Sequence, residues 1–151
     1  IRLLNSLWKT HNHVVYQHNF SVPPHPRGFH LISNYIFPLI QASGIENGIV
    51  QLFIQHTSAS LTINENADPT VREDFESHFN KFVPENAPYY QHDYEGSDDM
   101  PAHIKTALTN NQISLSIREG ELLLGTWQGL YLFEHRLNAQ NRTIIHHFIG
   151  D

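Results

Sequence analysis

The sequence predicts an α+β fold, in which a largely antiparallel β-sheet, arranged as a sandwich or a barrel-like sheet, has two to three helices packed on it. Two observations support this fold. Short stretches with apolar residues at alternate positions recur along the chain, and helix-start signals with an aspartate ahead of a proline interrupt them. From Ile113 onward, β-branched and aromatic stretches alternate with polar turns, which is typical of antiparallel strands.

The strands are predicted from the two-residue period of β-structure. The clearest segment follows Gly48, where Val50, Leu52 and Ile54 share one face. Polar turn residues between the later segments favour short connections. The expected strands are residues 14–18, 29–32, 48–55, 59–63, 114–117, 122–125, 129–135 and 143–149.

The helices are predicted from capping residues. Ser33 is the expected N-cap of the first helix, although Pro38 inside it opposes helix formation. Asp68 followed by Pro69 starts the second helix, and the sequence DDMP ahead of Ala102 starts the third. The expected helices end at Gly44, near Pro84 and at about Asn110.

Composition limits the possible functions. The chain has 151 residues and no Cys, so we expect one domain over residues 1–151 and no thiolate metal site, with residues 1–26 as an N-terminal extension or edge segment. A net charge of -6 with only 9 lysines and arginines argues against nucleic-acid binding. No apolar run approaches the length of a membrane span and no signal-peptide pattern is visible, so a cytoplasmic protein that does not enter a membrane is expected.

The segment HTSASLTINENAD, residues 56–68, is the most informative part of the chain. It combines an imidazole, hydroxyls, amides and carboxylates directly after a hydrophobic strand. His56 has the same parity as the core residues of that strand, and polar groups on a buried face are costly unless they are paired or used. We therefore predict a site here, in which His56 and Glu65 act in catalysis and Ser58 and Asn64 bind the substrate.

The twelve histidines include a candidate metal set. His103 lies in the first turn of the third expected helix, where the helix dipole keeps an imidazole neutral, and His92 precedes it in an acidic loop. Together with His56 they would suit zinc, with Glu65 as a carboxylate ligand and one position open. The alternative is that His92 and His103 only hydrogen-bond a polar loop. Asp68 and Asp99 are interpreted as helix caps.

The segment LGTWQGLYLFEHR, residues 124–136, is a third cluster. Trp127 and Gln128 could stack on and orient a flat heterocycle, although a tryptophan can equally fill a corner of a sheet. Glu134 shares parity with the apolar residues of its strand, whereas His135 does not. A buried Glu134 would need a histidine, an arginine or a metal as its partner.

Three blocks resemble the signatures of the YjbQ-like family, also called secondary thiamine-phosphate synthases: HTSASLTINENADP at 56–69, DDMPAHIK at 98–105 and LGTWQGLYLFEHR at 124–136. The similarity covers about residues 27–150. It implies an α+β fold, a homotrimer and a polar site whose histidines can hold a metal. It also implies a weak activity that couples a pyrimidine-methyl diphosphate to a thiazole phosphate with release of diphosphate.

The residues can be compared with that chemistry. A leaving diphosphate needs cations, for which Arg118, Arg136 and Arg142 are candidates, with Arg118 and Arg136 as predicted substrate ligands. Displacement by a ring nitrogen needs no dedicated base, although Gln128 and Glu134 remain candidate catalytic residues. A histidine set favours zinc, whereas diphosphate chemistry usually uses magnesium.

Three functions therefore remain open. The first is the transferase that the resemblance implies, and the second is a metal-dependent hydrolase of a small phosphorylated or acyl metabolite, with Glu65 as base. The third is a non-catalytic trimeric protein that binds a metal or a metabolite. In each case we expect a small-molecule ligand, phosphorylated in the first, and a divalent metal that is zinc rather than magnesium.

Overall fold

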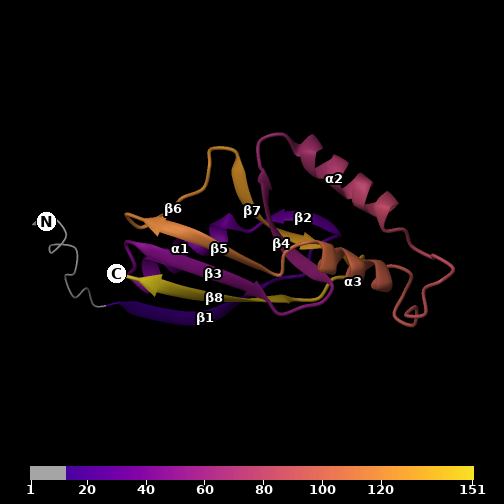
Figure 1. Ribbon diagram of the computed structural model, residues 1–151, viewed down its shortest axis with the longest axis horizontal. Coiled ribbons are helices and arrows are strands. Elements are labelled where there is room, and N and C mark those ends of the chain that lie inside the picture. Colours follow the sequence, from indigo (N-terminus) through magenta and orange to yellow (C-terminus); the bar gives the residue numbers. More distant parts are fainter. Residues whose placement is uncertain (1–12) are drawn as a thin grey trace, which may run out of the picture.

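The computed structural model describes residues 13–151, which form two antiparallel sheets and three helices (Figure 1). The larger sheet has five strands in the order β1, β8, β3, β5 and β6, and the smaller sheet has the order β2, β7 and β4. The strands of the larger sheet are β1 (Val14–Val22), β8 (Arg142–Gly150), β3 (Gly48–Ile54), β5 (Gln112–Arg118) and β6 (Glu121–Leu122). Those of the smaller sheet are β2 (Gly28–Leu31), β7 (Gln128–Glu134) and β4 (Ala59–Glu65).

The hydrophobic core lies between the two sheets. Alternation in β3 buries Val50, Leu52 and Ile54, as the sequence predicts, and β4 and β7 contribute Leu61 and Leu132 from the other side. The two sheets are not closed into a barrel, so the fold is a sandwich-like α+β arrangement. This confirms the predicted fold class and selects the sandwich.

Helix α1 (Ser33–Ser43) ends at Gly44, whose left-handed φ of 70° makes glycine the favourable residue there. Ser33 is not the N-cap that the sequence predicts. It is the first residue of the helix, and its hydroxyl accepts a hydrogen bond from the Leu130 amide at 3.0 Å. Pro38 is tolerated because it lies on the exposed face, where water can satisfy the carbonyl that loses its partner.

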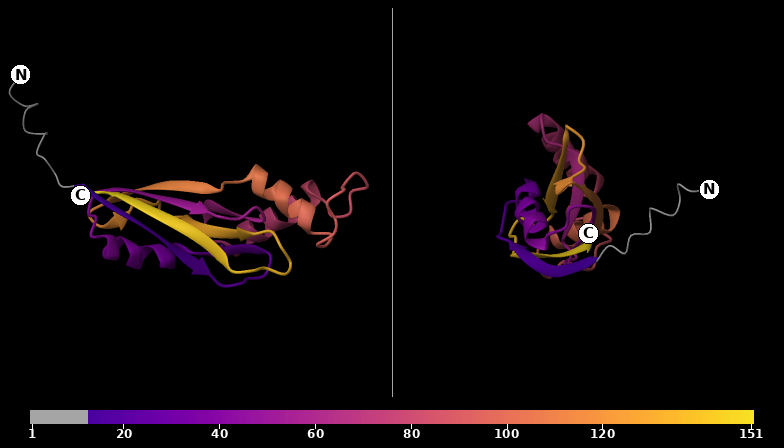
Figure 2. Two further views of the ribbon diagram at one scale, coloured as in Figure 1. Left: turned by 90° about the horizontal axis from the view of Figure 1, so that it is seen from below. Right: turned by 90° about the vertical axis from the view of Figure 1, so that its left-hand side faces the viewer.

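Helices α2 (Pro69–Phe82) and α3 (Asp99–Leu108) are linked by a long loop at one end of the molecule. Figure 2 shows α3 and this loop at the end opposite the C-terminus, with α1 near the C-terminal end. Asp68 caps α2 by accepting from the Thr70 amide, as predicted. Helix α3 begins at Asp99, within the DDMP sequence that predicts its start. No helix within residues 13–151 is long and apolar enough to span a membrane.

Strand β7 is buried on both faces. Glu134 lies on the core side, as parity predicts, but His135 on the opposite side is also buried. The second face is covered because Phe133 stacks on Phe29, with ring centroids 4.0 Å apart, and packs against Phe79 of α2. The expectation that only one of the two residues is interior is therefore wrong.

Candidate metal centre

A cluster of metal-ligating side chains lies where α3 begins. Within the described residues, one group of three ligand atoms lies within 4.8 Å of one another, and it comprises His92, Asp99 and His103. Nε2 of His92 is 2.7 Å from Asp99 Oδ2, and Nε2 of His103 is 3.4 Å from Asp99 Oδ1. Two imidazole nitrogens and one carboxylate make a donor set that zinc accepts, with a position left for a further ligand.

The start of α3 positions two members of this cluster. Asp99 and His103 are four residues apart, so they lie on the same helix face. The N-cap residue is Asp98, which makes no side-chain capping bond and instead accepts from the Arg136 Nε and the Leu137 amide. Burial alone would raise the pKa of Asp98. The Leu137 amide and Arg136 outweigh burial and hold this pKa below its ordinary value. Asp99 is therefore not the cap that the sequence indicates.

The Asp99 carboxylate is buried and only partly satisfied. Its side chain is 2% exposed, and Oδ1 accepts a 2.6 Å hydrogen bond from Arg136 Nη1. Oδ2 has no hydrogen-bond partner, although His92 Nε2 approaches it closely. A buried carboxylate oxygen without a partner is costly, and a cation between the two imidazoles would satisfy it. The residues therefore fit a divalent metal.

The orientation of His103 also suits a metal ligand. Its Nδ1 lies 3.0 Å from the Thr57 carbonyl oxygen, which can only accept a hydrogen bond. The neutral ring therefore carries its proton on Nδ1 and directs the Nε2 lone pair toward Asp99. This arrangement of a backbone carbonyl behind a histidine is the usual support for a histidine that ligates a metal.

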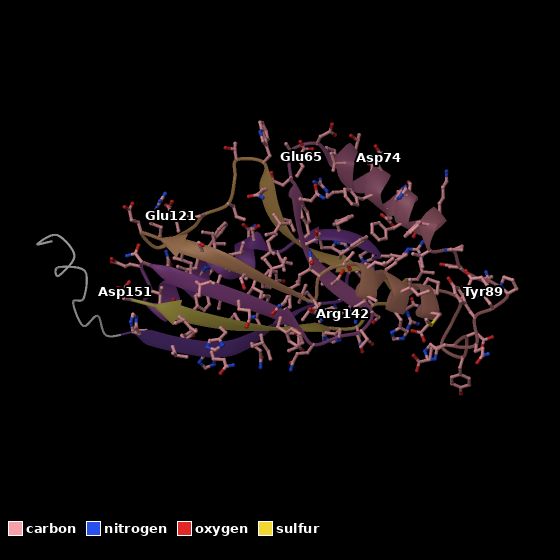
Figure 3. All side chains as sticks on the ribbon, viewed as in Figure 1. Glu65, Asp74, Tyr89, Glu121, Arg142 and Asp151 are labelled. Carbon is pink, nitrogen blue, oxygen red and sulfur yellow. The ribbon has the colours of Figure 1, made fainter. Side chains whose placement is uncertain are left out.

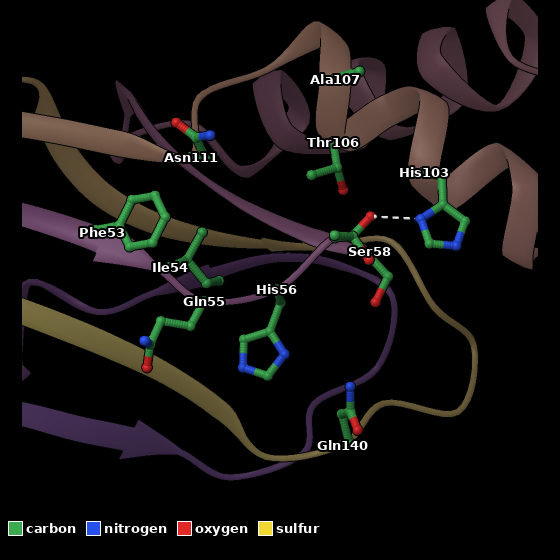
Figure 4. A pocket seen from close by; sticks show the side chains of 11 residues that line it. Phe53, Ile54, Gln55, His56, Ser58, His103, Thr106, Ala107, Asn111 and Gln140 are labelled. Atoms are coloured by element: carbon green, nitrogen blue, oxygen red, sulfur yellow. Dashed lines mark hydrogen bonds between the residues drawn. The ribbon is translucent and has the colours of Figure 1, made fainter.

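A cavity of about 590 Å³ adjoins the cluster. His103 lies on one side of it, and His56 and Ser58 of the segment between β3 and β4 lie on the other (Figure 4). The Ser58 hydroxyl accepts a hydrogen bond from Arg142 Nη1 at 3.0 Å, so its own proton is free for another acceptor. Phe53, Ile54, Gln55, Thr57, Thr106, Ala107, Asn111 and Gln140 complete the wall.

Arg142 and Glu134 form a buried ion pair behind this cavity. Arg142 Nε donates to Glu134 Oε1 at 2.7 Å, and both side chains are almost completely buried. Glu134 Oε2 also accepts from the amides of His135 and Arg136. The predicted burial of Glu134 is confirmed, and of the three partners considered, a histidine, an arginine or a metal, the structure shows an arginine. Both carboxylate oxygens of Glu134 accept hydrogen bonds from the protein, so they are not available to a ligand in the cavity. The ion pair instead orients Ser58, because Arg142 donates to the Ser58 hydroxyl.

His56 lies outside the three-residue cluster. Its Nε2 accepts a 2.8 Å hydrogen bond from the Thr143 amide, which places the proton of the neutral ring on Nδ1. Burial, followed by the nearby Arg142, lowers its pKa. His56 thus lines the cavity as a neutral ring, and Asp99 occupies the place in the cluster that the sequence gives to His56.

Four predicted site residues lie at the other end of the smaller sheet. Strand β4 runs from Ala59 to Glu65, so Glu65 is roughly 20 Å from Ser58. Figure 3 shows Glu65 beside the start of α2, well away from Arg142. Gln128 pairs with Glu65 in the sheet, and Trp127 is 64% exposed. Within one chain, Asn64, Glu65, Trp127 and Gln128 are therefore not brought to the cavity.

The two arginines predicted as substrate ligands lie in different places. Arg118 is exposed where β5 pairs with β6, opposite Glu121, which Figure 3 shows at the end of the molecule away from α3. Arg136 lies at the cluster, but Asp98 and Asp99 already hold its guanidinium. Its role in this geometry is to orient the Asp99 carboxylate.

A buried polar network beneath α3 has no counterpart in the sequence predictions. His135 Nε2 is 2.9 Å from the Ser60 hydroxyl, which accepts from Thr109. Burial is the main cause that lowers the pKa of His135 to about 3, and burial followed by Arg27 lowers the pKa of Lys105. The signal that could have revealed this network is the polar residue His135 directly after a strand in which Tyr131 and Phe133, at the same parity, are aromatic.

The family model for UPF0047 protein YjbQ-like matches residues 18–151. The chain belongs to the YjbQ-like family. It is 51% identical to UPF0047 protein YjbQ of Salmonella typhimurium over 86% of this chain and 94% of that protein. It is 45% identical to UPF0047 protein sll1880 of Synechocystis over 83% and 85% of the two chains.

Solved structures of the YjbQ-like family share this fold. A conserved protein of Clostridium acetobutylicum is 33% identical, with a TM-score of 0.77 over 86% of this chain and 98% of that one. A protein of unknown function from Sulfolobus solfataricus gives a TM-score of 0.82 at 24% identity, over 93% and 100% of the chains. The sandwich-like fold is therefore common to these chains.

Proposed function

We propose that this chain is a divalent-metal-dependent enzyme, which binds its metal through His92, Asp99 and His103 and acts on a small metabolite in the cavity that His103 lines. The observation that carries the proposal is the buried Asp99 carboxylate between two imidazole Nε2 atoms. The ligand types favour zinc over magnesium, because magnesium prefers oxygen ligands and retains its waters. When bound, a divalent cation supplies positive charge for an oxygen of the substrate or leaving group.

The reaction we propose first is the one that the family resemblance implies. A ring nitrogen of a thiazole phosphate forms a bond to the methylene carbon of a pyrimidine-methyl diphosphate, and the C–O bond to diphosphate breaks with its electron pair. No proton has to be removed in that step. The chain's own residues would position the pyrimidine ring through the Ser58 hydroxyl and the Asn111 and Gln140 amides along the cavity wall. We further propose that the protein is a homotrimer.

One observation favours hydrolysis as a second candidate. Among the described residues, the cavity wall contains no arginine or lysine, and the nearby Arg136 and Arg142 are held by carboxylates. A diphosphate would meet only the metal and neutral groups there. A small phosphorylated or acyl substrate with less charge would fit this wall. Water would attack the phosphorus or acyl carbon, the bond to the leaving alcohol would break, and that alcohol would take up the proton that the water releases. A divalent cation bound to His92, Asp99 and His103 would supply positive charge for the substrate oxygen.

The two reactions are tested together on purified full-length protein. The protein is depleted of metal with a chelator, reloaded with zinc, manganese or magnesium, and assayed for thiamine phosphate formation and for release of phosphate or acid from simple esters. We expect one activity to return with zinc and to be lost in Asp99→Asn. The variant His78→Gln, which removes an exposed histidine of α2, is the matched control and should retain it. Tight zinc binding without turnover of either substrate class would select a binding protein instead.

A further inference from the structure

A second cavity lies at the end of the smaller sheet that the proposed metal site does not use. Its volume is about 330 Å³, within the range of small-molecule sites. It shares no lining residue with the cavity beside His103. The residues that line it come from the loop before β2, from β2, from the chain after β4, from α2 and from β7: His25, Phe29, His30, Leu31, Asn66, Arg72 and Tyr131.

Arg72 is the cation of this cavity. Its Nη1 donates to the Tyr131 hydroxyl at 3.0 Å, and the guanidinium lies 5.6 Å from the centre of the Tyr131 ring. Tyr131 in turn donates to the Glu65 carbonyl at 3.1 Å, which fixes the hydroxyl. The guanidinium is therefore held in place while most of its five N–H donors are left for a ligand.

No carboxylate neutralises Arg72. Within the described residues, Arg72 has no ion pair within 4.0 Å, whereas Arg27, Arg136 and Arg142 each have one. Asp68, whose pKa is lowered first by hydrogen bonds from Thr70 and also by Arg72, uses its carboxylate to bind Thr70. A half-buried guanidinium that is oriented but not paired is a typical anion-binding group.

Two imidazoles and an aromatic wall complete the cavity. The rings of His25 and His30 stack with centroids 4.4 Å apart, and Phe29 meets Tyr131 edge to face at 5.8 Å. The two carboxylates that act on His30 from a distance, Glu76 and Glu134, are paired with Arg27 and Arg142. His30 Nε2 donates to the Pro26 carbonyl at 2.5 Å, so His25 supplies the imidazole donor for a ligand. The cavity therefore combines donors for an anion, from Arg72 and His25, with apolar surface for a flat ring.

Gly129 keeps this space open. A Cβ at this position would lie 2.8 Å from Leu31 Cδ1, 3.0 Å from Asn66 Cβ and 3.2 Å from the Tyr131 ring. All three of these neighbours line the cavity. Any side chain at residue 129 would push into its wall, so the glycine allows these residues to come together.

We infer that this second cavity binds the phosphate group of a small ring-containing phosphate monoester through Arg72 and the imidazole of His25. The phosphate offers three oxygens to the guanidinium of Arg72 and the imidazole N–H of His25, and the ring lies against Phe29 and Tyr131. Asn66, which follows β4, supplies an amide to the wall of the cavity. Asn66, in the informative segment 56–68, thus has a binding role separate from the metal site.

The experiment titrates full-length protein with phenyl phosphate, inorganic phosphate and benzoate, with and without a metal chelator, by calorimetry and by the histidine ring resonances of His25 and His30. We expect phenyl phosphate to bind more tightly than the other two and its affinity to be unaffected by the chelator. Arg72→Gln should weaken it by about tenfold or more, because a charge-assisted contact is lost. Lys81→Gln, the same charge change on the same helix, should leave the affinity unchanged.

Other results would overturn the inference. These are tighter binding of benzoate than of phenyl phosphate, equal affinities in Arg72→Gln and wild type, no binding by any probe, or loss of binding in His103→Gln instead. Tyr131→Phe gives a second test if Arg72→Gln folds poorly. It keeps the ring but removes the hydroxyl that orients the guanidinium, so weaker phenyl phosphate binding is expected and an unchanged affinity would count against the site.

Discussion

The Nδ1–H of His103 donates to the backbone carbonyl of Thr57, with 3.0 Å between nitrogen and oxygen. This hydrogen bond joins α3 to the segment between β3 and β4, and it leaves the Nε2 lone pair of His103 directed at Asp99. The side chain that the proposed metal needs is thus fixed by a backbone atom of the segment that lines the cavity.

The tautomer of His103 can be measured directly. In metal-free protein at neutral pH, we expect the neutral His103 ring to carry its proton on Nδ1, because the Thr57 carbonyl cannot donate. Long-range ¹H–¹⁵N correlation spectra distinguish the two tautomers. A proton found on Nε2 would mean that the hydrogen bond to Thr57 does not form in solution.

Arg136 should support metal binding without touching the metal. Its guanidinium holds Asp99 Oδ1 at 2.6 Å, so Arg136→Gln should weaken zinc affinity by roughly 10- to 100-fold, as expected for loss of a residue that orients a ligand. Competition with a zinc chelator gives the affinity. Arg118→Gln removes an arginine far from α3 and serves as the control. Equal losses in both variants would point to a general effect of charge.

The Glu134–Arg142 pair should be essential for stability. Both side chains are buried, so Glu134→Gln leaves an uncompensated guanidinium and should lower the free energy of unfolding by about 3 to 5 kcal/mol. The double variant Glu134→Gln with Arg142→Met removes that charge and should recover part of the loss. Urea unfolding of the three proteins checks this. A double variant no more stable than Glu134→Gln would contradict it.

His135 should make the fold sensitive to acid. Burial, together with Lys105 and Arg142, lowers its pKa from 6.5 to about 3 in the folded chain, so between these values only the unfolded chain binds the proton. The free energy of unfolding therefore falls as pH drops below 6.5 and continues to fall toward pH 3, by up to about 5 kcal/mol. Urea unfolding at pH 7 and pH 5 should show a smaller difference for His135→Gln than for wild type. The exposed His78→Gln is the control, and identical pH dependence in all three would contradict the prediction.

Local signals in the sequence predicted most of the fold. Alternation identified β3, Gly44 marked the end of α1, and Asp68 with Pro69 marked the start of α2. The prediction that Ser33 is the N-cap of α1 was wrong, because a serine hydroxyl can accept from any nearby amide and this one accepts from the Leu130 amide, which is distant in sequence. The burial of His135 was missed because a two-residue period cannot show that α2 and β2 cover the second face of β7.

The candidate site was predicted only in part. The predicted residues His92, His103 and Arg136 lie together at one place. The four-residue spacing of Asp99 and His103 indicates that both lie on one helix face, but Asp99 was interpreted only as a helix cap. Glu65 lies only seven residues after Ser58 in the sequence. Those seven residues form the extended strand β4, so Glu65 lies at the opposite end of the strand from Ser58. Which end of a strand joins a site depends on long-range packing, which motif order does not encode.

The most direct test of the proposed metal site is the metal content and affinity of Asp99→Asn beside wild type. The substitution keeps the size of the side chain but removes the charge that two imidazoles and Arg136 surround. We expect purified wild-type protein to hold zinc near one equivalent per chain, with ligand nitrogens from His92 and His103 in its X-ray absorption spectrum, and Asp99→Asn to bind it at least about tenfold more weakly. Zinc bound equally well by Asp99→Asn, or a coordination shell without histidine nitrogens, would contradict the account.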